Sequence, residues 1–132
     1  MRVLVMLPTY NEIENIQDVL ERTRRALPNA DVLVIDDGSP DGTAEAAEKL
    51  GAEMAAADTV GDLAGTGRVE VLRRASKSGL GSAYRAGFRI GLARGYDVMV
   101  EMDADLSHDP AVLPQLIDAV EQGADLAIGS RY

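Results

Sequence analysis

Residues 32–42 read Val-Leu-Val-Ile-Asp-Asp-Gly-Ser-Pro-Asp-Gly. A continuous run of valine, leucine and isoleucine is typical of a strand that is buried on both faces, as strands of parallel sheets are. The acids, glycines and proline that follow are turn-forming residues. The stretch therefore predicts a buried strand that ends in an acidic turn.

The same pattern recurs on both sides of this stretch. Further apolar runs predict strands at 3–7, 69–72, 98–102 and 126–128. Helical spacing of apolar residues predicts helices from a cap at Asn11 to about residue 27, and over 43–50, 82–93 and 110–122. Strands that alternate with helices predict one α/β domain over 1–132, with a mostly parallel open sheet and helices on both faces.

Several residues are expected to mark where helices begin and end. Asn11 and Glu14 fit a capping box. Asp41 fits the first turn of a helix, and Asp109, which precedes a proline, fits an N-cap. Gly51 is expected to end the helix that begins near residue 43.

Composition excludes several classes of function. The net charge is −9, from 22 acidic and 13 basic residues, which disfavours nucleic-acid binding and docking on anionic lipid through diffuse charge. The absence of cysteine excludes disulfides, thiolate zinc sites and a cysteine nucleophile, and it fits a reducing compartment such as the cytoplasm. No apolar stretch approaches the ~20 residues of a membrane-spanning helix, so the chain is expected to be soluble.

Unusual polar residues follow the predicted strands, at their carboxyl ends. They are segments 8–12, 36–39, 77–81 and 103–105, and Arg131. Ligands of open α/β sheets bind at this edge, near a switch in strand order. Folding alone would not sort polar residues by edge, so the distribution predicts a binding site.

Asp103 and Asp105 form the sharpest pair. In extended chain their side chains would project to the same side. Two such carboxylates suit Mg²⁺ or Mn²⁺, which commonly binds one or two carboxylates and the oxygens of a diphosphate. The alternative is a pair of solvated turn acids beside the cap residue Asp109.

Other candidates also have two interpretations. The acids of 36–39 either form a turn or accept hydrogen bonds from a nucleobase or ribose. The 77–81 loop either contacts a ligand or opens a helix tightly, and His108 is a loop residue or a ligand. Arg131 either pairs with a diphosphate or is a surface residue. The sequence contains no P-loop, and its glycines do not form a dinucleotide fingerprint.

Five segments together resemble the inverting family 2 glycosyltransferases, and most closely the polyprenyl (dolichyl) phosphate mannosyltransferases that use GDP-mannose. They are Leu-Pro-Thr-Tyr-Asn-Glu (7–12), Val-Ile-Asp-Asp-Gly-Ser-Pro-Asp-Gly-Thr (34–43), Gly-Leu-Gly-Ser-Ala-Tyr (79–84), Met-Asp-Ala-Asp-Leu-Ser-His-Asp-Pro (102–110) and Gly-Ser-Arg-Tyr (129–132). The resemblance implies a Rossmann-like, glycosyltransferase A-type domain that binds a nucleotide sugar.

The resemblance also implies roles for individual residues. A donor site would be lined by Pro8, Tyr10, Glu12, Ile35, Asp37, Asp103 and Ala104. Asp105 would ligate the metal that bridges the diphosphate, with Ser107 as a further metal-side ligand. Arg131 would bind phosphates, and Asp105 and Arg131 would carry the catalytic electrostatics.

The implied reaction is transfer of mannose from GDP-mannose to a polyprenyl phosphate, with inversion and with Mg²⁺ or Mn²⁺, at the cytoplasmic face of a membrane. A UDP-sugar donor and a non-catalytic nucleotide-sugar-binding module are the alternatives. Members of this family continue beyond the Gly-Ser-Arg-Tyr segment, so the acceptor loop and membrane contacts are expected outside residues 1–132.

Overall fold

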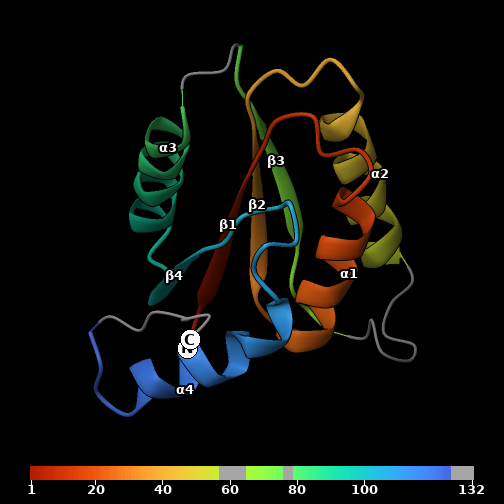
Figure 1. Cartoon of the computed structure of the whole chain (residues 1–132). Coiled ribbons are helices and arrows are strands. Elements are labelled where there is room, and N and C mark those ends of the chain that lie inside the picture. The colour runs from red at the N-terminus through yellow and green to blue at the C-terminus, as the bar shows by residue number, and fades with distance from the viewer. Residues whose placement is uncertain (57–64, 76–78, 126–132) are drawn as a thin grey trace.

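The computed structural model describes residues 1–56, 65–75 and 79–125. Strands and helices alternate along them, as predicted (Figure 1). The strands are β1 (Val3–Thr9), β2 (Asp31–Asp36), β3 (Val69–Arg73) and β4 (Val98–Glu101). The helices are α1 (Ile16–Ala26), α2 (Thr43–Ala56), α3 (Leu80–Ala93), the 3-10 turn η2 (Pro110–Val112) and α4 (Leu113–Glu121).

All strand pairings in the described sheet are parallel, in the order β3-β2-β1-β4. The chain therefore moves outward from β1 to β3 and then returns to the other side of β1 to form β4. This reversal is a switch in strand order, and open α/β sheets commonly bind ligands outside the carboxyl ends of their strands at such a point. The sheet therefore contains the switch in strand order near which the binding site was predicted.

Side chains that alternate along the strands supply two apolar cores. Val5 and Leu7 face the larger core, which β1 and β2 share with α1, α2 and α4. Leu4 and Met6 face the opposite side, against α3. Figure 1 shows α3 on one side of the sheet and α1 and α2 on the other. The prediction that β1 and β2 are buried on both faces, with helices on both sides of the sheet, is confirmed.

Two predicted helix boundaries are wrong. Asn11 has φ 56° and lies outside the helix, which begins at Ile16. The backbone of Asn11 turns because its N–H is held by Ser39 from another loop. Gly51 does not end α2, because its missing Cβ lets the helix pack on β3: a Cβ would lie 3.0 Å from that of Val69.

Asp109 is an N-cap, as predicted: its Oδ1 accepts a hydrogen bond from the N–H of Ala111 at 3.0 Å. The first turn after it is 3-10, and the α-helix proper begins at Leu113. The strand predicted at 126–128 lies outside the described residues. Within them, no helix is both long and apolar enough to span a membrane.

Candidate functional site at the carboxyl edge of the sheet

The strands end at different heights at this edge. Thr9 of β1, Asp36 of β2 and Arg73 of β3 lie in one row across the sheet. The last residue of β4, Glu101, pairs with Met6, so β4 ends three residues lower than β1. Residues 102–108 therefore continue beside the end of β1. The segments after β1 and β4 flank the switch in strand order, as the sequence predicted.

The loops after β1 and β2 are tied to each other through side chains of segment 39–43. Three successive backbone N–H groups of residues 11, 12 and 13 donate to this segment. Their acceptors are Oγ of Ser39 at 2.9 Å, Oγ1 of Thr43 at 2.9 Å and Oδ2 of Asp41 at 3.1 Å. The polar residues of this turn thus fix the loop that carries the predicted ligand residues of β1.

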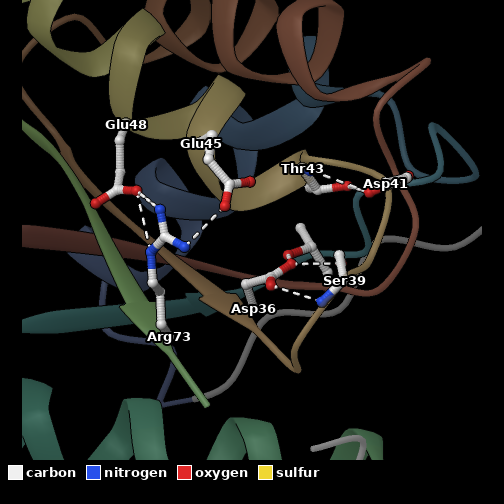
Figure 2. Close-up of polar contacts among 8 residues, drawn as sticks. Asp36, Ser39, Asp41, Thr43, Glu45, Glu48 and Arg73 are labelled. Carbon is white, nitrogen blue, oxygen red and sulfur yellow. Dashed lines mark hydrogen bonds and ion pairs between the residues drawn. The ribbon is translucent and has the colours of Figure 1, made fainter. Parts of the chain in front are cut away.

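Asp41 has a structural role at the start of α2, which confirms its assignment as a helix-start residue. Its Oδ1 accepts from the N–H of Thr43 at 3.0 Å and from its hydroxyl at 2.5 Å (Figure 2). Burial on its own would raise the pKa of Asp41, but the hydrogen bonds from Thr43 and Ile13 outweigh it and lower the pKa.

Replacing Asp41 by Asn is expected to lower the free energy of unfolding by about 1 kcal/mol at pH 7, because one amide oxygen cannot replace two carboxylate oxygens. A lowered native pKa stabilises the fold above the unfolded value near 3.8, and this contribution disappears as the pH falls through the native value. Urea unfolding of both proteins from pH 7 to pH 3 should show the difference shrink below about pH 4.

Asp18→Asn is the matched control, because within the described residues Asp18 forms an exposed i,i+4 pair with Arg22 on α1 and no other ion pair. It should change stability by less than about 0.5 kcal/mol. A difference for Asp41→Asn that stays constant across this pH range would contradict the assignment.

The two acids that end β2 have different partners. Asp36 is 2% exposed and accepts a hydrogen bond from the hydroxyl of Thr9 at 2.8 Å. It also accepts one from the hydroxyl of Ser39 at 2.6 Å (Figure 2). It joins β2 to β1 and to its own turn, so its role is structural. Asp37 instead forms an ion pair with Arg74: Oδ1 lies 3.1 Å from Nε. Of the two, Asp37 is the one predicted to contact the donor.

Asp103 and Asp105 both follow β4, but the extended chain predicted for them is not observed. The strand ends at Glu101, residues 104 and 105 form a turn, and Leu106 has φ 65°. This turn gives the two carboxylates separate partners. Asp103 accepts from the hydroxyl of Tyr84 on α3 at 3.3 Å, whereas Asp105 accepts from the N–H of Ser107 at 2.9 Å.

The electrostatics of this turn keep one carboxylate ionised and one hydroxyl protonated. Hydrogen bonds from Ser107 are the main cause that lowers the pKa of Asp105. Burial, and then the negative charge of Asp103, raise the pKa of Tyr84. Asp105 is thus an exposed anion at neutral pH, while the Tyr84 hydroxyl stays a hydrogen-bond donor to Asp103.

The oxygen ligands at this turn suit a hard cation that is also ligated by the substrate. Asp105 offers an exposed, ionised carboxylate, and Ser107, the other predicted metal-side residue, lies beside it. Within the described residues no group of three or more acidic, histidine or cysteine side chains converges as a metal site. Mg²⁺ and Mn²⁺ can bind through one or two protein ligands when phosphate oxygens of the substrate complete the coordination shell.

The remaining predicted donor residues are placed at different depths. Tyr10 is 38% exposed, and Pro8 and Glu12 are half-buried on the β1 side. Glu12 also accepts a hydrogen bond from the Asn15 side chain at 3.1 Å. Ile35 is fully buried in the core under α3, so its side chain does not reach the surface of the edge.

Ala104 is also buried, in the opposite core. His108 accepts a hydrogen bond from the backbone N–H of Asp103 through Nδ1 at 3.2 Å, so within the described chain it shapes the turn. Lys77 and Arg131 lie outside the described residues.

Arg74, Ser82 and Tyr84 were missed by the sequence reasoning. Arg74 directly follows β3 at the same edge as the acids, so the rule that selected the acids would also have found this cation. Ser82 and Tyr84 lie in the first turns of α3, inside segment 79–84, to which the resemblance assigned no individual residue roles. All three contact the described site.

A separate groove lies between α1 and the segment that contains η2 and the start of α4. Its lining residues are Arg22, Arg25, Ala26, Asp109, Ala111 and Pro114. Arg25 and Ala26 end α1, so the groove lies toward the amino edge of the sheet. It contains none of the residues predicted to bind the donor.

Comparison with known proteins identifies relatives of the chain. The family described as Glycosyl transferase family 2 matches residues 4–132. The chain is 54% identical over 131 residues to the polyprenol monophosphomannose synthase of Mycolicibacterium smegmatis, covering 99% of this chain and 45% of that protein. It is 55% identical over 131 residues to the undecaprenyl-phosphate mannosyltransferase of Micrococcus luteus, covering 99% and 49%.

A third relative is the dolichol-phosphate mannosyltransferase of Pyrococcus furiosus, 44% identical over 134 residues, with 100% of this chain and 34% of that protein covered. The chain thus spans half or less of the length of these curated relatives.

Solved structures have the same fold. The mannosyltransferase PcManGT from Pyrobaculum calidifontis, in complex with GDP-Man and Mn²⁺, matches with a TM-score of 0.62 and 28% identity, over 79% of this chain and 27% of that one. TarS of S. aureus matches with a TM-score of 0.61 over 92% of this chain and 33% of that one; at 19% identity it supports the fold alone. These are glycosyltransferase A-type structures, as predicted. Because the family match extends over nearly the whole sequence, the chain belongs to glycosyl transferase family 2.

Proposed function

We propose that the chain binds GDP-mannose at the carboxyl edge of its sheet and transfers the mannose to a polyprenyl (dolichyl) phosphate, with inversion and with Mg²⁺ or Mn²⁺. One observation carries the proposal: segments 8–12 and 102–109 follow β1 and β4, the two strands that flank the switch in strand order, and segment 36–43 is hydrogen-bonded to segment 8–12. Asp105 offers an exposed carboxylate there. The names of the relatives and the GDP-Man and Mn²⁺ in the PcManGT structure support the substrate class.

Different residues would bind different parts of the GDP-mannose donor. Tyr10, exposed after β1, and Asp37, after β2, would contact the nucleoside. Asp105, with Ser107, would hold the cation, which when bound neutralises charge on the departing diphosphate. Arg131 would contact the phosphates.

The acceptor supplies its own nucleophile. A phosphate monoester has a second pKa of about 6 and is largely dianionic at pH 7. One of its oxygens attacks the anomeric carbon opposite the nucleotide; the bond to the diphosphate breaks and the configuration inverts. The protein then has to hold the donor so that this face is open. We place the reaction at the cytoplasmic face of a membrane, because the acceptor is a membrane lipid and the chain lacks cysteine.

Calorimetric titration tests the donor. The chain is titrated with GDP-mannose and with UDP-glucose, each with Mn²⁺ and with EDTA, and we expect GDP-mannose with Mn²⁺ to bind tightest by at least about 10-fold, one decade of Kd. Tighter binding of UDP-glucose would reassign the donor, and no binding of either would overturn the proposal.

Labelled GDP-mannose and a polyprenyl phosphate then test turnover by the chain. Labelled lipid product supports transfer. Binding without product would leave residues 1–132 as a donor-binding module.

A further inference from the structure

We infer that Arg74 is a positioning residue that orients the carboxylate of Asp37 for the nucleoside part of the donor. The inference rests on the function proposed above. It assigns a role to an arginine that is paired with one of the acids at the carboxyl edge.

Arg74 is fixed at both of its ends. Its backbone N–H donates to the carbonyl of Asp36 at 2.7 Å, which continues the β2–β3 ladder by one residue. Its Nη2 donates to the hydroxyl of Ser82 on α3 at 2.6 Å. Between these anchors, Nε lies 3.1 Å from Oδ1 of Asp37. The guanidinium thus links Asp37 to the first turn of α3.

The pair is largely removed from water. The side chain of Arg74 is 16% exposed and that of Asp37 is 8% exposed. Burying an ion pair costs desolvation that the attraction often fails to repay, so such pairs are weak contributors to stability. Within the described residues, Nη1 of Arg74 is buried and has no hydrogen-bond partner, which adds to the cost.

Folding has no evident need for this pair at this place. Asp36 already joins the end of β2 to β1 and to the following turn. On the exposed side of the same edge, Arg73 binds Glu45 and Glu48 of α2 (Figure 2). Because the contacts of Asp36 and Arg73 already join the strands and helices at this edge, the buried Asp37–Arg74 pair is not needed to hold them together. Such a pair is expected where function needs a charged group in a fixed orientation.

The chemistry of Asp37 explains what the orientation is for. An ionised carboxylate only accepts hydrogen bonds, and a nucleoside offers donors in its ribose hydroxyls and base N–H groups. A largely buried guanidinium paired with one oxygen restricts how the carboxylate can rotate, and hence the direction in which its other lone pairs point. Arg74 therefore acts on the nucleoside through Asp37.

The test measures Kd for GDP-mannose and for pyrophosphate, which lacks the nucleoside, both with Mn²⁺. In Arg74→Met we expect GDP-mannose to bind at least about 10-fold more weakly and pyrophosphate to change by less than about 2-fold. Arg74→Lys, which keeps the charge, should recover part of the loss. Arg73→Met is the matched control, because it removes the neighbouring but exposed arginine; it should leave both affinities unchanged.

A double-mutant cycle separates positioning from support of the fold. Arg74→Met leaves a buried carboxylate without this partner, so its melting temperature should fall, and adding Asp37→Asn should restore much of it. The affinity for GDP-mannose should not be restored, and the double variant should bind no more weakly than Asp37→Asn alone.

Three results would overturn the inference while the proposed function stands: unchanged GDP-mannose binding in folded Arg74→Met, an equal loss for pyrophosphate, or losses that add in the cycle. If the unsubstituted chain binds no GDP-mannose, the proposed function fails, and the role of Arg74 fails with it.

Discussion

Asp105→Asn should abolish the metal dependence of donor binding. In the presence of Mn²⁺ we expect Kd for GDP-mannose to rise by about 10- to 100-fold, whereas in EDTA the variant and the original chain should bind alike. The reason is the geometry of the turn after β4: Asp105 is the exposed carboxylate there, and hydrogen bonds from Ser107 lower its pKa. An amide keeps the shape but loses the charge that attracts the cation.

Calorimetry with both metal conditions provides the measurement. Asp118→Asn is a suitable control, since Asp118 is an exposed acid on α4 whose side chain, in the part of the chain that the structure describes, accepts a hydrogen bond from Gln122. Equal Mn²⁺ dependence in Asp105→Asn and in the control would remove Asp105 from the metal site. A loss that persists in EDTA would instead indicate a distorted loop.

The sequence predicted the fold well because the signals that decide it are local and strong. Buried strands such as β2 are continuous apolar runs, and the turn residues that follow them mark the carboxyl edge. The boundaries that were missed depend on partners remote in sequence. Asn11 does not cap α1 because Ser39 holds its N–H, and Gly51 continues α2 because β3 packs against it.

The candidate site was predicted in part for the same reason. The acids could be predicted as site residues because they directly follow strands, but their spacing in the sequence does not show which partner each acid binds. Asp36 and Asp37 are adjacent, yet one is bound by Thr9 and Ser39 and the other by Arg74. Which acid faces a ligand is decided by residues that join the edge from elsewhere in the chain.

The pair Asp103 and Asp105 illustrates the limit of periodicity. Two-residue spacing places side chains on one side only while the backbone stays extended. Here the strand ends at Glu101, and a left-handed residue, Leu106, closes a turn. Tertiary contact with Tyr84 then selects the orientation of Asp103. A turn of this kind has no strong local signal, because leucine rarely adopts positive φ.

Gly67→Ala should lower the free energy of unfolding more than any other substitution proposed for this chain. Gly67 lies just before β3, where a Cβ would stand 2.0 Å from the carbonyl oxygen of Ala30. The contact is with backbone, so no rotamer change relieves it. The strands cannot separate easily either, because the N–H of Val32 donates to the carbonyl of Arg68 at 2.7 Å and the N–H of Gly67 donates to that of Pro28 at 3.2 Å.

We expect Gly67→Ala to lower the free energy of unfolding by about 3 kcal/mol and the melting temperature by about 10 °C. Gly81→Ala is the matched control: near the start of α3 the nearest atom to a new Cβ is Nη1 of Arg85 at 3.5 Å, so alanine fits and should be neutral or slightly stabilising. Thermal and urea unfolding compare the two. Because Gly67 is at the amino side of β3, away from the acids, folded Gly67→Ala should still bind the donor below its melting temperature. A variant that melts like the original chain would show that the segment before β3 can move away from Ala30 at little cost.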